Sequence, residues 1–280
     1  TVRGGAPSQS IVVVDGVVLR SPFATGTDIS GIDADAIAEA QILRGGQGAL
    51  LGDGALSGAL ILTSDYRRPR ASITLGSFET LKIAVGGGGD RGWISGVYQR
   101  SNGRFGFTER LEGLPDLEKT RGNNDVEQGR FTAGGSTQLG RWQLASRMFV
   151  DARVAGTPGP ISPGEVRDGA RESRLAGVLG FSLKRPLQIK QAGLLQLDAA
   201  VHGLIIDFRD TSTADRIFLE TQFVSAQTSA SLDVSWNEHL LRTSAELQPE
   251  WVSSDIPDVA RLRAAFAFAD EWRVGAWTLV

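Results

Sequence analysis

The chain has 280 residues, with 29 Lys and Arg against 32 Asp and Glu, a formal net charge of −3 and no cysteine. The lack of cysteine excludes disulfide scaffolds and thiol catalysis, and the 2 histidines, His202 and His239, leave few candidates for a metal site or a catalytic triad. The slightly acidic charge gives no reason to expect nucleic acid as a partner. No stretch reaches the ~18 consecutive apolar residues of a membrane helix, but membrane-spanning strands stay possible because their residues alternate.

Residues 1–65 are predicted to form a small α+β domain. Two apolar runs, Ile11–Val14 and Val17–Leu19, flank Asp15 and Gly16, residue types that favour the positive φ of a tight hairpin turn. Asp33 and Asp35 predict a short helix over residues 36–39, because carboxylates cap the amino terminus of a helix. Two further apolar runs predict short buried strands, at 40–43 and 59–62.

From residue 66 onward, apolar and polar residues alternate with a period of two. In one such segment Leu241, Ala245 and Leu247 share a face, and Arg242 and Glu246 share the opposite face. These segments predict about eleven strands, many near the ~9–11 residues that cross a bilayer as a tilted strand. Their spans are 69–76, 78–87, 92–101, 127–138, 141–151, 173–184, 194–209, 219–236, 238–252, 258–269 and 272–280.

The connections between these strands alternate in length. The short ones fall at 90–92, 139–140, 237–238 and 270–271, a medium one at 185–193, and the long polar ones at 102–126, 153–172 and 210–218. Short turns at one rim and long loops at the other are typical of an outer-membrane barrel. A soluble β-sandwich also alternates, but its strands average only about 5–6 residues.

Four tryptophans lie within two residues of the predicted short turns. They are Trp93, Trp142, Trp236 and Trp272. Their position predicts an aromatic girdle at one membrane interface. The plainer explanation is that tryptophan is common in strands generally.

A series of short motifs follows in a fixed order along the chain. They are Val2 to Gly4, Ile11 to Gly16, Ile37 to Gly45, Leu51 and Gly52, Ala55, Gly58 to Ile61, and then Gly76 to Phe78 and Ser101 to Gly103. In order and spacing the first six resemble the plug-domain signature of the TonB-dependent outer-membrane receptors, and the last two look like the start of that family's barrel.

The resemblance implies a mainly β fold in two parts. Residues 1–65 would be an α+β plug domain, and residues 66–280 the amino-terminal half of a transmembrane β-barrel, with about 11 of an implied 22 strands. The chain begins at Thr1 without an initiator Met and ends in an apolar run. We therefore expect a fragment that lacks the family's N-terminal partner-binding box and the second half of the barrel.

The resemblance also implies a function. It is the TonB-dependent active import of a scarce, bulky nutrient, a ferric siderophore or a cobalamin-like molecule, across the outer membrane of a Gram-negative bacterium. The implied partners are TonB, reached through the missing box, the metal chelate or cobalamin ligand, and outer-membrane lipid. We expect no cofactor, no resident metal and no catalytic residue, because transport makes and breaks no bond.

The resemblance also implies which residues form the plug motif and hold the plug in the barrel. The plug motif and its tethers would be Arg3, Asp15, Gly16, Arg44, Gly45, Gly52 and Gly58. Arg3 and Arg44 occupy the plug-arginine positions, where ion pairs with carboxylates of the inner barrel wall are expected. Glu246 and Glu250, on the polar face of a predicted strand, are candidate wall carboxylates.

The predicted long loops offer weaker candidates. One is a sharply turning loop at the outer rim that could contact substrate, formed by Thr157, Pro158, Gly159 and Pro160. A second loop is acidic and could bind calcium, although it has no ordered calcium-loop signature and solvated charge is expected; its acids are Glu112, Asp116, Glu118, Asp125 and Glu127.

Two other classes of protein remain open at this point. A structural or adhesive outer-membrane barrel without transport would carry residues 1–65 as an independent, separable module. An outer-membrane enzyme would need a Ser/His/Asp set at the barrel rim, which His202 and His239 scarcely support. Within the transporter class, a receptor that also signals through an N-terminal domain is a further possibility.

Overall fold

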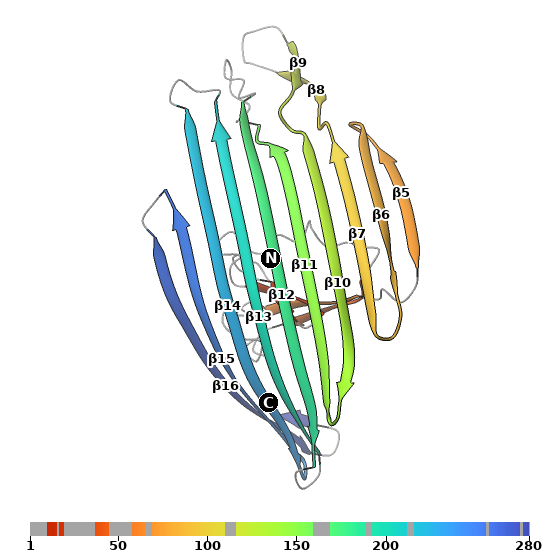
Figure 1. Ribbon diagram of the computed structural model, residues 1–280, viewed down its shortest axis with the longest axis vertical. Helices are drawn as coiled ribbons and strands as arrows, with labels where there is room; N and C mark the ends of the chain where they lie inside the picture. Colours follow the sequence, from red (N-terminus) through yellow and green to blue (C-terminus); the bar gives the residue numbers. More distant parts are fainter. Residues whose placement is uncertain are drawn as a thin grey trace.

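The computed structural model describes residues 10–15, 17–19, 37–44, 58–64, 69–109, 116–158, 169–188, 192–211, 216–255, 258–274 and 277–279. Within these ranges every regular element is a strand, and the strands form a four-stranded sheet, an eleven-stranded sheet and a two-stranded hairpin (Figure 1). None of the described residues lies in a helix long and apolar enough to cross a membrane.

The small sheet has the strand order β2-β1-β4-β3. β1 (Ser10–Val14) and β2 (Val17–Leu19) form the predicted antiparallel hairpin, and Asp15 at its turn has a φ of 51°. β4 (Gly58–Ser64) runs parallel to β1 and antiparallel to β3 (Ile37–Arg44). The buried core of this sheet consists of Ile11, Val13 and Ala59.

The structure confirms the two short strands predicted in this region and corrects the helix. Residues 40–43 and 59–62 lie within β3 and β4. The helix predicted over 36–39 is wrong where the structure describes it, because Ile37–Glu39 begin β3 and pair with β4 through a register shift. Pairing with a neighbouring strand outweighs the local capping signal here; the capping residues themselves lie outside the described ranges.

The large sheet contains eleven strands, each antiparallel to its neighbours. Across the sheet they are β5 (Arg70–Gly76), β6 (Thr80–Gly88), β7 (Gly92–Ser101), β10 (Val126–Leu139), β11 (Trp142–Gly156), β12 (Ala170–Leu187), β13 (Ala192–Asp210), β14 (Ile217–Trp236), β15 (His239–Ser254), β16 (Val259–Val274) and β17 (Trp277–Leu279). β7 pairs directly with β10, because the segment between them forms the separate hairpin of β8 (Phe105–Glu109) and β9 (Leu117–Arg121).

These eleven strands match the eleven predicted ones in number and order, which confirms the mainly β fold. Several strands are longer than predicted toward the long connections, and β14 reaches 20 residues. The hairpin of β8 and β9 lies where the sequence predicted only a loop. The turn predicted at 270–271 is wrong, because Asp270 and Glu271 lie inside β16 and pair with β15.

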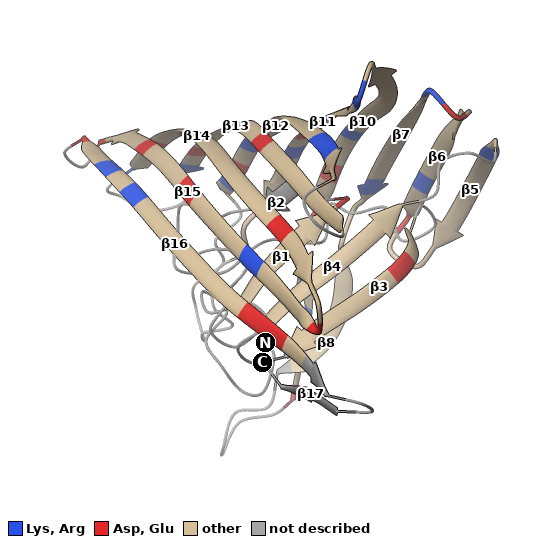
Figure 2. Cartoon of the chain, turned by 90° about the horizontal axis from the view of Figure 1, so that it is seen from below, with Lys and Arg blue, Asp and Glu red and all other residues tan. Residues whose placement is uncertain are grey.

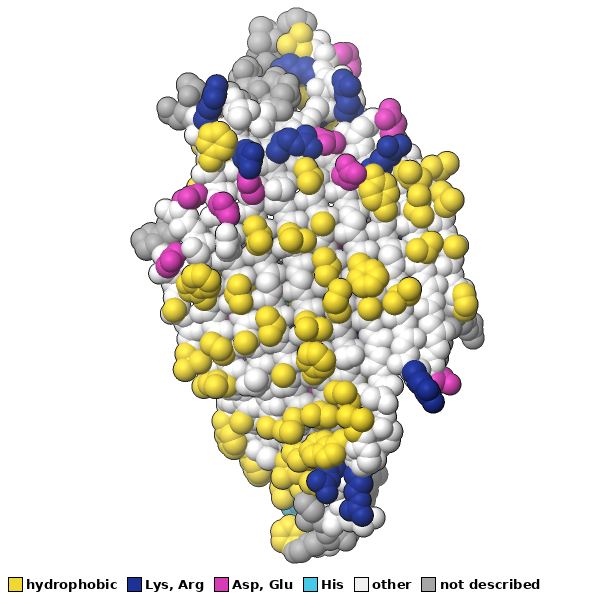
Figure 3. Space-filling view, in the orientation of Figure 1, with side chains coloured by type: hydrophobic (Ala, Val, Ile, Leu, Met, Phe, Trp, Pro, Cys, Tyr) yellow, Lys and Arg dark blue, Asp and Glu magenta, His cyan; other side chains and the backbone are white. Residues whose placement is uncertain are grey.

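The large sheet is curved, and its two faces differ in chemistry. The convex face is apolar: Leu262, Phe266 and Phe268 of β16 are 66%, 75% and 63% exposed, and hydrophobic side chains cover the middle of the surface in Figure 3. The concave face is polar, and Gln248 and Glu250 of β15 are buried on it. The small sheet lies on the concave side, within the trough formed by the long strands (Figure 2).

Candidate functional site: the contact between the small sheet and the concave wall

Asp15, at the turn between β1 and β2, fastens this turn to the end of β4. Its backbone N–H donates to the carbonyl oxygen of Leu62 at 2.7 Å, and its carboxylate Oδ1 accepts a hydrogen bond from the backbone N–H of Ser64 at 2.5 Å. The side chain is only 5% exposed. A buried carboxylate requires hydrogen bonds and a cation, because its charge is costly to remove from water.

Arg147 of β11 supplies that cation. Its Nη1 lies 3.0 Å from Oδ2 of Asp15 and also donates to the backbone carbonyl oxygens of Asp15, at 2.6 Å, and Val14, at 3.3 Å. The alternation of β11 turns this side chain to the concave face, opposite to its apolar neighbour Met148. One guanidinium therefore binds both the side chain and the backbone of the hairpin turn.

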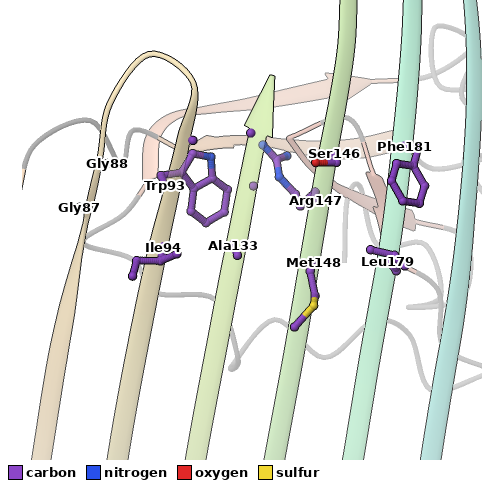
Figure 4. A pocket seen from close by; sticks show the side chains of 13 residues that line it. Gly87, Gly88, Trp93, Ile94, Ala133, Ser146, Arg147, Met148, Leu179 and Phe181 are labelled. Atoms are coloured by element: carbon purple, nitrogen blue, oxygen red, sulfur yellow. The ribbon is translucent and has the colours of Figure 1, made fainter. Parts of the chain in front are cut away.

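Trp93 of β7 supports Arg147 from the wall. The guanidinium carbon of Arg147 lies 5.5 Å from the centre of the Trp93 ring, within cation–π range. Gly134 of β10 pairs with both residues across the sheet, so the three share one face. Figure 4 shows the Trp93 and Arg147 side chains on either side of β10. A Cβ on Gly134 would lie 2.7 Å from the Trp93 ring, so glycine is required for the ring to lie flat beside Arg147.

This arrangement corrects part of the predicted aromatic girdle. Trp93 faces the concave side, although it lies next to a short turn. Trp236 and Trp272 lie near the short-turn rim with 47% and 44% of their surface exposed. His239 stacks on Trp272 with ring centres 5.7 Å apart, and its Nδ1 lies 2.9 Å from the carboxylate of Asp270.

The predicted plug residues are only partly within the described ranges. Gly58 begins β4 with a φ of 139°, a backbone conformation that favours glycine. Arg44 ends β3, but its side chain lies outside the description. Arg3, Gly16, Gly45 and Gly52 lie outside the described residues. The tethering role of Arg3 and Arg44 therefore stays a prediction, and the contact of Asp15 with Arg147 has the opposite polarity, with the cation on the wall.

The candidate wall carboxylates lie on the concave face of β15. Glu250 is 6% exposed and accepts hydrogen bonds from Arg261 and from Gln248, the latter at 3.0 Å. Its carboxylate also forms an ion pair with Arg263 at 3.3 Å. Glu250 is thus engaged by arginines of the neighbouring strand of the wall. Glu246 precedes it on the same face of β15.

A second buried carboxylate of the concave wall is also paired with an arginine of the neighbouring strand. Asp151 of β11 is 2% exposed and lies 3.2 Å from a guanidinium nitrogen of Arg130 of β10, while Gln128 donates to the same carboxylate oxygen at 2.8 Å. His202 of β13 is also buried, at 4% exposure. The sequence placed Glu246 and Glu250 on the polar face of their strand but assigned no specific partner to either.

The loop candidates are also partly described. Thr157 donates its backbone N–H to the carbonyl oxygen of Ala170 at 2.9 Å, and Pro158 follows it; Gly159 and Pro160 lie outside the described residues. Three acids of the acidic loop contact protein groups: Glu118 accepts from Thr108, Asp125 pairs with Arg171, and Glu127 accepts from Tyr98. The described residues contain no group of three His, Cys, Asp or Glu side chains placed to hold a metal ion.

Part of the chain is similar in sequence to known proteins. Residues 1–59 match the family model of the TonB-dependent Receptor Plug Domain. The vitamin B12 transporter BtuB of Photobacterium profundum is 30% identical over 118 residues, which are 40% of this chain and 19% of that protein.

Two solved structures share the fold at low identity. The siderophore receptor PiuA from Acinetobacter baumannii has a TM-score of 0.63 at 10% identity, over 97% of this chain and 49% of that one. The pyoverdine outer membrane receptor FpvA from Pseudomonas aeruginosa PAO1 has a TM-score of 0.61 at 11% identity, over 98% of this chain and 54% of that one. The chain therefore spans about half the length of these solved relatives.

A small sheet held by polar contacts inside a curved antiparallel wall with an apolar outer face defines the class of plugged β-barrels. In the described residues the wall is open, with β5 and β17 at its edges. The motif match covers most of the small sheet, and the fold match covers both sheets. Residues 1–59 thus match the plug domain of the TonB-dependent receptors, and the chain as a whole shares its fold with outer-membrane receptors of this kind.

Proposed function

We propose that the protein imports a scarce, bulky nutrient across the outer membrane of a Gram-negative bacterium with energy delivered through TonB. Residues 1–65 are the plug and residues 66–280 are the first half of the barrel. The ligand is a ferric siderophore or a cobalamin-like molecule, the ligand classes named for PiuA, FpvA and BtuB. We assign no catalytic role to any residue.

The observation that carries this proposal is the contact between Asp15 and Arg147. It joins the plug hairpin to the wall at 3.0 Å, with the carboxylate almost fully removed from water. A gate for large molecules must be closed at rest and must open under force. A small number of polar contacts in a partly wet interior meets both needs, because each is weak enough to break in turn.

The two faces of the wall support the same proposal. Exposed apolar side chains such as Phe266 and Phe268 on the convex face suit contact with lipid. Buried polar residues such as Glu250 and Asp151 on the concave face suit a hydrated interior that surrounds a plug. The alternative of a non-transporting barrel with a separable module receives less support, because Asp15 is fastened to the wall.

Uptake by cells tests the proposal directly. Cells that express the full-length receptor are given labelled ferric siderophores of several chemical classes and labelled cyanocobalamin, in TonB-containing and TonB-deficient strains. We expect uptake of one ligand class that stops when TonB is removed or the proton-motive force is collapsed. Uptake that is unchanged without TonB would contradict active import, and binding of none of these ligands would contradict the proposed ligand classes.

A further inference from the structure

A shallow groove on the convex face has a floor of small residues. It lies over β6, β7 and β10 near the short-turn rim, where Gly87, Gly92, Ala133 and Gly135 occupy outward positions in paired register. The backbone of Pro69 lies 3.1 Å from the Cβ position of Gly87, and the backbone of Arg91 lies 2.6 Å from that of Gly135, so these two segments border the floor. Figure 3 shows the lower ends of these strands as a white area beside the yellow side chains of the neighbouring strands. Small residues at neighbouring positions on three strands leave a depression in an otherwise apolar surface.

Bulky apolar side chains flank this floor. Ile94 of β7 borders it on one side, and Met148 of β11 with Leu179 and Phe181 of β12 borders it on the other (Figure 4). These four side chains are between 38% and 60% exposed. In a membrane, an unfilled groove of this kind would forfeit dispersion contacts along its whole lining, so a lipid chain that fills it gains them.

Two arginines lie below the groove at the short-turn rim. Arg185 is on the outward face of β12, four residues from Phe181 or ~13 Å along the strand, and its guanidinium carbon lies 5.4 Å from the centre of the Trp142 ring. Arg141 is exposed in the turn between β10 and β11. Within the part of the chain that the structure describes, neither arginine forms an ion pair, and Nε of Arg185 is buried without a hydrogen-bond partner.

We propose that this groove binds one anionic phospholipid of the membrane leaflet on the short-turn side. An acyl chain lies on the glycine floor, and the headgroup phosphate is held by Arg185 and Arg141. Guanidinium groups bind phosphate oxygens through paired hydrogen bonds, and long arginine side chains reach the headgroup level from the edge of the apolar zone. An anionic headgroup is favoured over a zwitterionic one because neither arginine is neutralised by a described carboxylate. The proposal rests on the proposed function only for the outer-membrane location.

Native mass spectrometry of the full-length receptor in detergent tests the site. The receptor is equilibrated with phosphatidylglycerol or phosphatidylethanolamine of identical acyl chains, and retained lipids are counted. We expect the wild type to retain phosphatidylglycerol about tenfold better, because both lipids offer a phosphate but the ammonium group of phosphatidylethanolamine repels the two arginines. Arg185→Gln should remove this preference, and Ala133→Phe, which fills the groove, should reduce the retention of both lipids.

Two matched variants serve as controls. Arg171→Gln removes an outward arginine at the opposite rim that is paired with Asp125, and Ala230→Phe adds a ring to the outward face of β14 away from the groove. Both should retain phosphatidylglycerol as the wild type does. Equal retention of the two lipids by the wild type, or unchanged retention by Arg185→Gln, would overturn the proposal. Because lipid retention is measured without transport, a receptor that imports nothing but selects this lipid would contradict only the proposed function.

Discussion

Arg147 of the wall and Asp15 of the plug are joined by an ion pair of 3.0 Å, and the same guanidinium nitrogen binds the backbone carbonyl oxygen of Asp15 at 2.6 Å. The carboxylate also accepts the backbone N–H of Ser64, so it links β11, the β1–β2 turn and the end of β4. The contact therefore depends on the plug hairpin being seated against the wall.

Replacement of Arg147 by alanine in the full-length receptor should loosen the plug. The change leaves the buried carboxylate of Asp15 without a cation, a loss of about 3–5 kcal/mol for buried pairs. We expect faster proteolysis of the plug and a raised passive entry of a bulky antibiotic that the outer membrane normally excludes. Arg153→Ala is the matched control, because Arg153 lies on the same face of β11 without a described contact to the small sheet. Equal proteolysis of the two variants would show that Arg147 does not hold the plug.

The side chain of Asp15 allows its charge to be separated from its role in the turn. Asparagine tolerates the positive φ of this position and can still accept the hydrogen bond from Ser64, but it removes the negative charge. Asp15→Asn should therefore loosen the plug less than Asp15→Ala, by about 1 kcal/mol, the net contribution of one hydrogen bond.

A charge exchange should fail to restore the contact. In Asp15→Arg with Arg147→Asp the ion pair could re-form, but the carbonyl oxygens of Val14 and Asp15 would lose their donor. Plug proteolysis in the full-length receptor distinguishes these variants. Wild-type protection in the exchanged receptor would mean that the ion pair alone is sufficient.

Gly134 should be intolerant of any side chain, because Trp93 occupies the space of its Cβ. In Gly134→Ala the new methyl would lie 2.7 Å from the ring, which must move away from Arg147. We expect a destabilisation of about 1–3 kcal/mol, typical of overpacking, and a shift in tryptophan fluorescence. Gly129→Ala is the control on the same strand, since a Cβ there meets no atom within 4 Å. A Gly134→Ala receptor with unchanged thermal unfolding in detergent would contradict this packing.

The large sheet could be predicted from the sequence because its signal is local. A period of two places Arg147 and Glu250 on one face and Phe266 on the other without any knowledge of neighbours. The same period would have placed Trp93 on the concave face, opposite to Ile94, but the prediction relied on its distance from a turn instead. Whether a tryptophan contacts lipid depends on the face of the sheet to which its side chain points, and not on its distance from a turn.

The contacts between the two sheets could not be predicted, because they depend on where the plug sits. No sequence pattern states that Asp15 meets Arg147, which is 132 residues away. The helix predicted before residue 40 failed for a related reason, since the pairing of β3 with β4 is not local. The hairpin of β8 and β9 was missed because its strands, at 5 residues each, are too short for a clear alternation.

A charged residue introduced on the outward face of β16 should impair assembly of the receptor more than one introduced on the inward face. Phe266 is 75% exposed on the apolar convex face, and an arginine at such a lipid-facing position costs about 2–4 kcal/mol near the bilayer midplane. Phe266→Arg should therefore lower the amount of heat-resistant, correctly assembled receptor in the outer membrane. Ala265→Arg is the matched control, because the adjacent residue faces inward and pairs across the sheet with Glu246, whose carboxylate is positioned near the new guanidinium. If both variants assembled equally well, or if Ala265→Arg were the more damaging, the convex face of β16 would not be the one that meets lipid.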